Sequence, residues 1–93
     1  MNLNIRTVTG TTTAAEDFTI LCDATSGAIT INLPAASTVT GRIYNVKKID
    51  NSVNTVTIDP NSTETIDGAA TNVISTQWTN IQFQSNGTNW FIL

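Results

Sequence analysis

Hydrophobic and polar residues alternate along several short stretches of the chain. In residues 28–33, aliphatic side chains alternate with alanine, threonine and asparagine, and residues 54–59 and 79–84 repeat the pattern with threonine, asparagine and glutamine. A period of two places the apolar side chains on one face of an extended strand and the polar ones on the other. These stretches therefore predict β-strands that each cover a core with one face.

Glycine-containing dipeptides and prolines divide the chain between such stretches. Turns are expected at Ser26-Gly27, Asp67-Gly68 and Asn86-Gly87, the last being the strongest hairpin signal, and Pro34 and Pro60 each end a strand. Strands are predicted near residues 3–9, 18–23, 28–33, 42–49, 54–59, 63–66, 70–75, 79–84 and 88–93. Their short spacing predicts an all-β fold, a small antiparallel β-sandwich or barrel-like roll of about eight or nine short strands, and disfavours a parallel solenoid with long repeats.

Two segments depart from the one-face pattern. Trp90, Phe91, Ile92 and Leu93 are apolar on both faces of a strand. We expect one face to lie on the domain's core and the other on a neighbouring subunit, and Tyr44 is assigned to the same oligomer interface. In residues 43–49 the apolar phase slips, which predicts a β-bulge near Lys47-Lys48.

The composition narrows the classes of function. Threonine, isoleucine and valine exceed a third of the residues, only 12% are charged, and the net charge is −3. This acidic balance argues against nucleic-acid binding, and neither a membrane-spanning run nor a signal peptide is visible. Residues 1–13 are expected to form an N-terminal arm or first strand, which can add to another subunit's sheet, before a single β-domain at 14–93. A chain this short without a disulfide is expected to oligomerise.

The sequence offers little catalytic chemistry. It contains no histidine, its single cysteine, Cys22, is expected to be a buried thiol, and the adjacent Glu16-Asp17 is best explained as a solvated turn. We therefore expect no enzyme, no cofactor and no metal, although a calcium site among Asp59, Asn61, Glu64 and Asp67 is the alternative considered for the acidic residues.

The remaining candidate groups are aromatic and basic. Trp78 lies in a polar context and is the candidate exposed aromatic for a ligand contact, whereas Trp90 is assigned to the core or an interface. The basic residues Arg42, Lys47 and Lys48 are interpreted as a solvated strand face or as partners of Asp50 or Asp59 in an intersubunit salt bridge.

Seven short motifs follow one another in an order that resembles a β-module of tailed-bacteriophage virion proteins, of the tail-fibre, head-fibre or capsid-decoration type. The resemblance covers about residues 14–93 and rests on residues 17–20 with 23–27, 31–36, 41–44, 47–50, 54–60, 64–68 and 86–90. It implies a homotrimeric structural module located in the virion, made in the bacterial host cytoplasm, with other capsid or tail proteins as partners. The family carries no catalytic residues.

Two functional hypotheses follow from the residues and the resemblance. The first is a capsid-decoration, head-fibre or tail-appendage protein that acts by protein–protein adhesion through apolar strand faces. The alternative is the receptor- or glycan-binding tip of a tail fibre, which needs an exposed aromatic side chain and takes a host surface glycan as partner.

Overall fold

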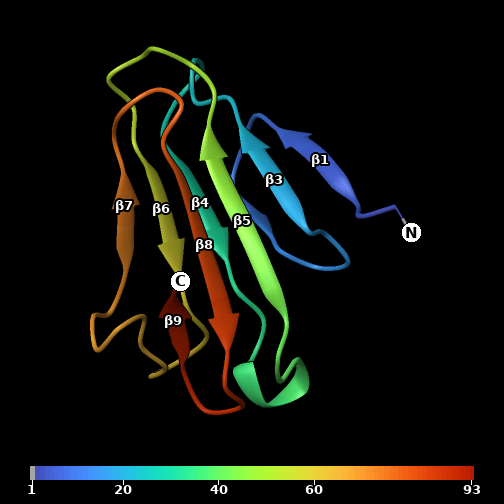
Figure 1. Ribbon diagram of the computed structural model, residues 1–93. Helices are drawn as coiled ribbons and strands as arrows, with labels where there is room; N and C mark the ends of the chain where they lie inside the picture. Colours follow the sequence, from blue (N-terminus) through green and yellow to red (C-terminus); the bar gives the residue numbers. More distant parts are fainter. Residues whose placement is uncertain (1) are drawn as a thin grey trace.

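Two mixed β-sheets make up the protein, whose computed structural model describes residues 2–93 (Figure 1). The five-stranded sheet has the order β1 (Ile5–Val8), β3 (Thr19–Cys22), β5 (Ile43–Lys48), β8 (Asn80–Ser85) and β9 (Trp90–Ile92). The four-stranded sheet has the order β2 (Thr12–Thr13), β4 (Ile29–Asn32), β6 (Val56–Asp59) and β7 (Asn72–Ile74). One 3₁₀ turn, η1 (Ala36–Thr38), is the helical element of the described chain. The all-β prediction is confirmed.

The first six strands alternate between the two sheets and pair in parallel. β1, β3 and β5 run in one direction in the five-stranded sheet, and β2, β4 and β6 are likewise parallel in the four-stranded sheet. The predicted antiparallel arrangement is therefore wrong for this half of the chain, which winds as a short two-sheet solenoid. Alternation in a sequence identifies the faces of a strand but not its partner, and the Ser26-Gly27 turn crosses between sheets instead of closing a hairpin.

Neighbouring rungs of this solenoid place like residues side by side. In the β4–β6 pair Ile29 lies beside Val56, Ile31 beside Ile58, and Thr30 beside Thr57. The parallel register thus extends an apolar column into the core and a threonine column onto the surface.

The last three strands pair antiparallel with their neighbours, and both of the later predicted glycine turns, Asp67-Gly68 and Asn86-Gly87, are present. β8 and β9 are joined by the turn at Asn86-Gly87, where Gly87 has φ +94°. Asp67 and Gly68 have φ +48° and +82° between the paired residues Ile66 and Ala69, as a type I′ turn requires. The strand predicted at 63–66 is absent from the described residues except for the bridges of Ile66.

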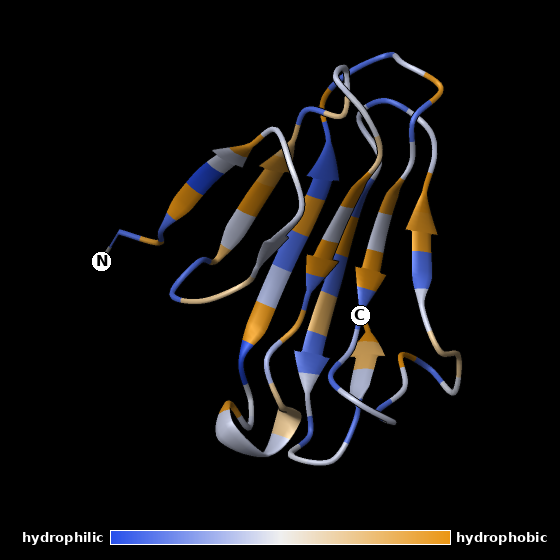
Figure 2. Cartoon of the chain, turned by 180° about the vertical axis from the view of Figure 1, so that it is seen from behind, coloured by the Kyte–Doolittle hydropathy of each residue, from blue (hydrophilic) through white to orange (hydrophobic). Residues whose placement is uncertain are grey.

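The core fills the space between the sheets, and the alternating hydropathy of the strands is visible in Figure 2. Ile20, Val46 and Phe83 from the five-stranded sheet and Ile31 and Ile58 from the four-stranded sheet are fully buried. Cys22 is buried as predicted. Burial, helped by the nearby Asp50 carboxylate, raises the pKa of its thiol to about 12.

A buried ion pair, not a bulge, explains the phase slip in β5. The register is continuous from Ile43 opposite Gln84 to Lys47 opposite Asn80, so Lys48 points inward on the same side as Val46. The Lys48 side chain is fully buried, and its Nζ donates to Asp50 Oδ2 at 2.7 Å. The predicted bulge at this position and the solvated or intersubunit interpretation of Lys48 are therefore wrong.

Asp50 is held as a carboxylate by several donors. Besides Lys48, its oxygens accept hydrogen bonds from Ala24 N at 2.8 Å, Ser52 N at 3.0 Å and the Ser52 hydroxyl. Burial alone raises the pKa of the Asp50 carboxyl, but these hydrogen bonds outweigh it and hold the pKa well below its usual value.

The N-terminal segment belongs to the same two sheets. Within residues 1–13, β1 pairs with β3 and β2 pairs with β4 of the same chain. Arg6 Nε and Nη2 donate to the two carboxylate oxygens of Asp17 at 3.0 and 2.9 Å. Asp17 is buried, so the interpretation of Glu16-Asp17 as a solvated turn holds for Glu16 only. No helix among residues 2–93 is long and apolar enough to cross a membrane.

Candidate functional site on the outer face of the five-stranded sheet

The outer face of the five-stranded sheet consists of the side chains that point away from the core. The strand register places them in rows across the sheet. Two of these rows and the adjoining Leu3 form what we call the assembly surface: Leu3, Ile5, Thr19, Ile43, Asn45, Gln82, Gln84, Phe91 and Leu93. All nine side chains are uncharged, and apolar residues alternate with threonine, asparagine and glutamine across the five strands of this sheet.

Apolar side chains are exposed at both margins of the assembly surface. Ile5 is 64% exposed at the β1 edge, and Leu93 is 61% exposed beyond β9, where its N–H donates to Gln82 O at 2.9 Å. Leu3 and Phe91 are exposed beside them. Large apolar side chains at both margins of one neutral face are typical of a surface that another molecule covers.

The residues predicted at the oligomer interface divide between this surface and the core. Tyr44 and Trp90 are fully buried in the protomer, with ring centroids 5.7 Å apart, and the Tyr44 hydroxyl donates to Ala15 O at 2.7 Å. Phe91, Ile92 and Leu93 are exposed. Because Tyr44 and Trp90 have no surface left for a partner, only the last three residues of the chain remain as interface candidates from that prediction.

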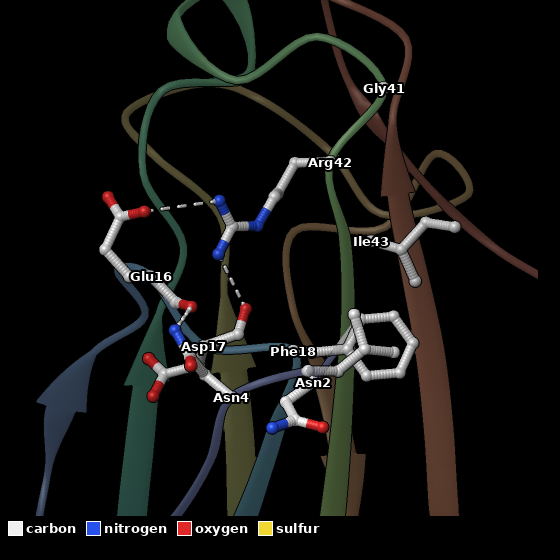
Figure 3. A pocket seen from close by; sticks show the side chains of 9 residues that line it. Asn2, Asn4, Glu16, Asp17, Phe18, Gly41, Arg42 and Ile43 are labelled. Carbon is white, nitrogen blue, oxygen red and sulfur yellow. Dashed lines mark hydrogen bonds and ion pairs between the residues drawn. The ribbon is translucent and has the colours of Figure 1, made fainter.

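A groove opens at the end of this face, where β1, β3 and β5 begin (Figure 3). Its volume is about 350 Å³, and it is lined by Asn2, Leu3, Asn4, Glu16, Asp17, Phe18, Gly41, Arg42 and Ile43. The N–H groups of Phe18 and Thr19 both donate to Asn4 O, at 2.9 and 3.0 Å, so two residues face one as in a β-bulge. This local distortion accounts for Phe18 lining the groove instead of joining Ile20 in the core.

The basic side chain in the groove is already engaged by the same chain. Arg42 Nη2 donates to Asp17 O at 2.8 Å, and Nη1 lies 3.8 Å from Glu16 Oε2 (Figure 3). The guanidinium also stands 5.1 Å from the Tyr44 ring centroid. Its positive charge therefore has several partners. The groove offers apolar contact at Phe18 and Ile43 but no free charged group.

Trp78 lies in the turn between β7 and β8 and is 61% exposed, as the sequence predicts. Its φ is +70°, a conformation that is an outlier for a bulky side chain. The turn is fixed by hydrogen bonds from Trp78 N to Lys48 O at 2.7 Å and from Gln77 Nε2 to Ile49 O at 3.2 Å. Lys47 Nζ stands 5.8 Å from the centroid of the Trp78 ring.

Among residues 2–93, no group of three or more histidine, cysteine, aspartate or glutamate side chains could hold a metal ion. Two of the acidic residues of the calcium alternative, Glu64 and Asp67, accept hydrogen bonds from the backbone. Glu64 accepts from Ala36 N with both carboxylate oxygens at 3.1 Å, and Asp67 Oδ1 accepts from Ile92 N at 3.2 Å.

Sequence reasoning missed two features of this region. The only sequence signal for the Lys48–Asp50 pair was a lysine at a position where the alternation calls for an apolar residue, two residues before an aspartate. The register also places Asn80 directly opposite Lys47, beside Trp78, which no local pattern indicates.

Comparisons with protein-family models, with curated proteins and with solved structures find no match to this chain. The features that bear on its function are therefore the geometry of the outer face and the motifs in the sequence.

Proposed function

We propose that this chain is a structural β-module that assembles with copies of itself through the assembly surface, forming a homotrimer. We further propose that the assembly is part of a bacteriophage virion, as a capsid-decoration, head-fibre or tail-appendage protein that binds other virion proteins by adhesion. The observation that carries the proposal is the assembly surface, whose side chains are all uncharged, with Ile5 and Leu93 exposed at its margins.

The neutrality of this face matters because symmetric assembly brings identical surfaces together. Like charges that face one another across an interface are destabilising, and the assembly surface contains none. Its threonine and glutamine side chains can be buried if they find hydrogen-bond partners, and Asn45 is already buried with its amide donating to Phe18 O. Burial of a few hundred Å² of apolar surface at about 25 cal/mol per Å² adds several kcal/mol, comparable to the whole stability of a small domain.

The phage assignment rests on the resemblance of the seven ordered motifs. They fall on the turns and strand ends that set this fold, including residues 23–27 between β3 and β4 and residues 64–68 before β7. A sequence pattern shared at turns indicates shared topology more than a shared ligand. The resemblance therefore supports a structural role better than it supports recognition of a particular host.

The test is the mass of the protein in solution and its response to charge on the assembly surface. Sedimentation equilibrium of the wild type is expected to give three times the 10.0 kDa chain mass. Leu93→Lys, which places three like charges near one axis, is expected to give a folded monomer. Val73→Lys is the matched control, because Val73 is exposed to a similar degree on β7 of the other sheet and is expected to leave the trimer intact.

A wild type that stays monomeric at millimolar concentration would overturn the assembly proposal. If the Leu93→Lys variant remains a trimer, the interface must lie on another part of the protein. Co-sedimentation of the wild type with phage capsids that lack the protein is expected if it decorates the capsid, and its absence would leave the tail as the site of attachment.

A second candidate function is the glycan-binding tip of a tail fibre. The observation that favours it is the exposed ring of Trp78, whose strained backbone is fixed by the hydrogen bond to Lys48 O. An exposed aromatic ring can stack on a sugar at low conformational-entropy cost, because only two χ angles must be ordered on binding.

A further inference from the structure

Three side chains lie near one another at one end of the outer face, and none of them is drawn into the core. Trp78 is exposed at a strained φ, Lys47 lies over its ring, and Asn80 is exposed directly opposite Lys47 on the neighbouring strand. Lys47 lies on β5, Asn80 begins β8, and Trp78 lies in the turn that leads into β8, so the register of two hydrogen-bonded strands fixes the spacing of Lys47 and Asn80. We infer that Trp78, Lys47 and Asn80 form a binding site for an acidic sugar, a pyranose ring that bears a carboxylate.

The ammonium group of Lys47 is the charged element of this site. The other three basic residues each have a carboxylate within 4.0 Å, in the pairs Arg6–Asp17, Arg42–Glu16 and Lys48–Asp50. Among residues 2–93, Lys47 has no such partner, and its only assigned contact is the Trp78 ring. In a chain with a net charge of −3, an unpaired cation held over an aromatic ring favours an anionic ligand.

The ring of Trp78 supplies the apolar element. A tryptophan at φ +70° costs free energy that a glycine at the same position avoids, and strained residues cluster where a side chain must be presented. Hydrogen bonds within the turn, from Trp78 N to Lys48 O and from Thr79 N to Thr76 O, hold the backbone under the ring. The indole ring can stack on the flat C–H face of a pyranose. A small anion such as acetate has no such face.

Asn80 supplies the neutral polar element. Its side chain is exposed, and within the described chain its amide makes no hydrogen bond. A carboxamide offers both a donor and an acceptor, which matches a sugar hydroxyl. Ring, cation and amide together match a hydroxylated ring that carries a carboxylate, and they match a neutral sugar less well.

The site deepens the second candidate function and does not depend on the trimer. It lies in the row next to the assembly surface, so a monomeric Leu93→Lys variant retains all three side chains. Trimer mass and sugar binding are separate measurements, and either one can fail alone.

The experiment compares trigalacturonate with its uncharged methyl ester, by calorimetry and by tryptophan fluorescence at low salt. The wild type is expected to bind the acid with a dissociation constant about tenfold lower than that of the ester, the gain of one charge-assisted contact. Binding is expected to shift the emission of exposed Trp78, while buried Trp90 contributes a constant background.

Three variants and a control test the roles of Trp78 and Lys47. Trp78→Gly removes the ring and the strained φ together, and it is expected to abolish binding of both ligands with the fold intact. Lys47→Gln is expected to equalise acid and ester, and Lys47→Arg to restore the difference. Val53→Ser is the control, because Val53 is an exposed apolar residue in the β5–β6 loop and is expected to change neither affinity.

Absence of binding at millimolar trigalacturonate would overturn the site. Equal affinity of the wild type for acid and ester would overturn the acidic-sugar assignment. Full binding by Trp78→Gly would place any sugar contact elsewhere on the protein.

Discussion

The two sides of the five-stranded sheet differ in how they accommodate charged residues. On β5 the adjacent lysines point to opposite sides. Lys48 points inward and is fully buried beside Asp50, whereas Lys47 points outward beneath the Trp78 ring. On the inner side the Lys48 charge is buried only because Asp50 neutralises it, whereas on the outer side the Lys47 charge has no carboxylate partner.

The two tryptophans repeat this contrast. Trp90 has no exposed surface and packs against Tyr44, while Trp78 is 61% exposed at a positive φ. A fully buried ring adds packing that the fold needs, whereas a mostly exposed ring at a strained position adds little to stability. The proposed division, with stability from the inner side and binding at the outer side, can be tested by removing corresponding groups from each.

The largest effect is expected from Asp50→Ala. The substitution leaves the buried Lys48 ammonium without its carboxylate and removes the acceptor for Ala24 N and Ser52 N. Breaking a buried ion pair by deleting one partner costs about 3–5 kcal/mol, because the remaining charge is uncompensated. Urea unfolding followed by circular dichroism is the measurement.

The double variant Lys48→Met, Asp50→Ala is its control. Removing both charges is expected to recover part of the loss, because no charge is then left buried. A loss equal to that of the single variant would mean that the lost backbone acceptor, and not the unpaired lysine, dominates.

Trp90→Ala is expected to come next, with a loss of about 3–4 kcal/mol from removal of a fully buried indole. Phe91→Ala, one residue along on the outer side, is expected to change the unfolding free energy of the monomer by less than about 1 kcal/mol. The pair is measured in a Leu93→Lys background, so that assembly does not contribute. Similar losses at both positions would contradict the division between inner and outer sides.

How much of this division was predictable from sequence depends on the residue. From the alternating stretches and the two later glycine turns, most strands and the burial of Cys22 and Trp90 could be predicted. They could not identify parallel partners, since pairing of β3 with β5 joins segments about 25 residues apart. The two-residue β2 is too short to produce a pattern.

The candidate site was only partly predictable. The polar context of Trp78 indicated an exposed ring, but its strained φ and the proximity of Lys47 and Asn80 arise from the register of β5 and β8. The Lys47-Lys48 pair shows the limit most clearly. Because side chains alternate along a strand, one of the two adjacent lysines must point inward. Lys48 can be buried because Asp50 neutralises it, and the local sequence does not specify the loop conformation that places Asp50 there.

A smaller effect is expected on lowering the pH. Because hydrogen bonds depress the folded-state pKa of Asp50, its contribution to stability is complete above the unfolded pKa of about 4 and is lost as pH falls below it. One proton gives a slope of at most about 1.4 kcal/mol per pH unit. Asp50→Asn is expected to flatten the wild-type stability profile below pH 4, and exposed Glu16→Gln is expected to retain it. Parallel profiles for wild type and Asp50→Asn would remove Asp50 from the acid response.

The smallest effect is expected from Trp78→Gly. Loss of the indole removes little packing, because the ring is mostly in solvent. Relief of the strained φ favours the variant, and the greater freedom of glycine in the unfolded chain opposes it by about 0.5–1 kcal/mol. The net change in unfolding free energy is expected to stay within about 1 kcal/mol, far from the value for Trp90→Ala. Trp78→Ala keeps a Cβ at the strained position and is expected to be the less stable of the two variants. If Trp78→Gly unfolded as readily as Trp90→Ala, the Trp78 ring would be part of the packed core. Packing, and not ligand binding, would then explain its strained φ.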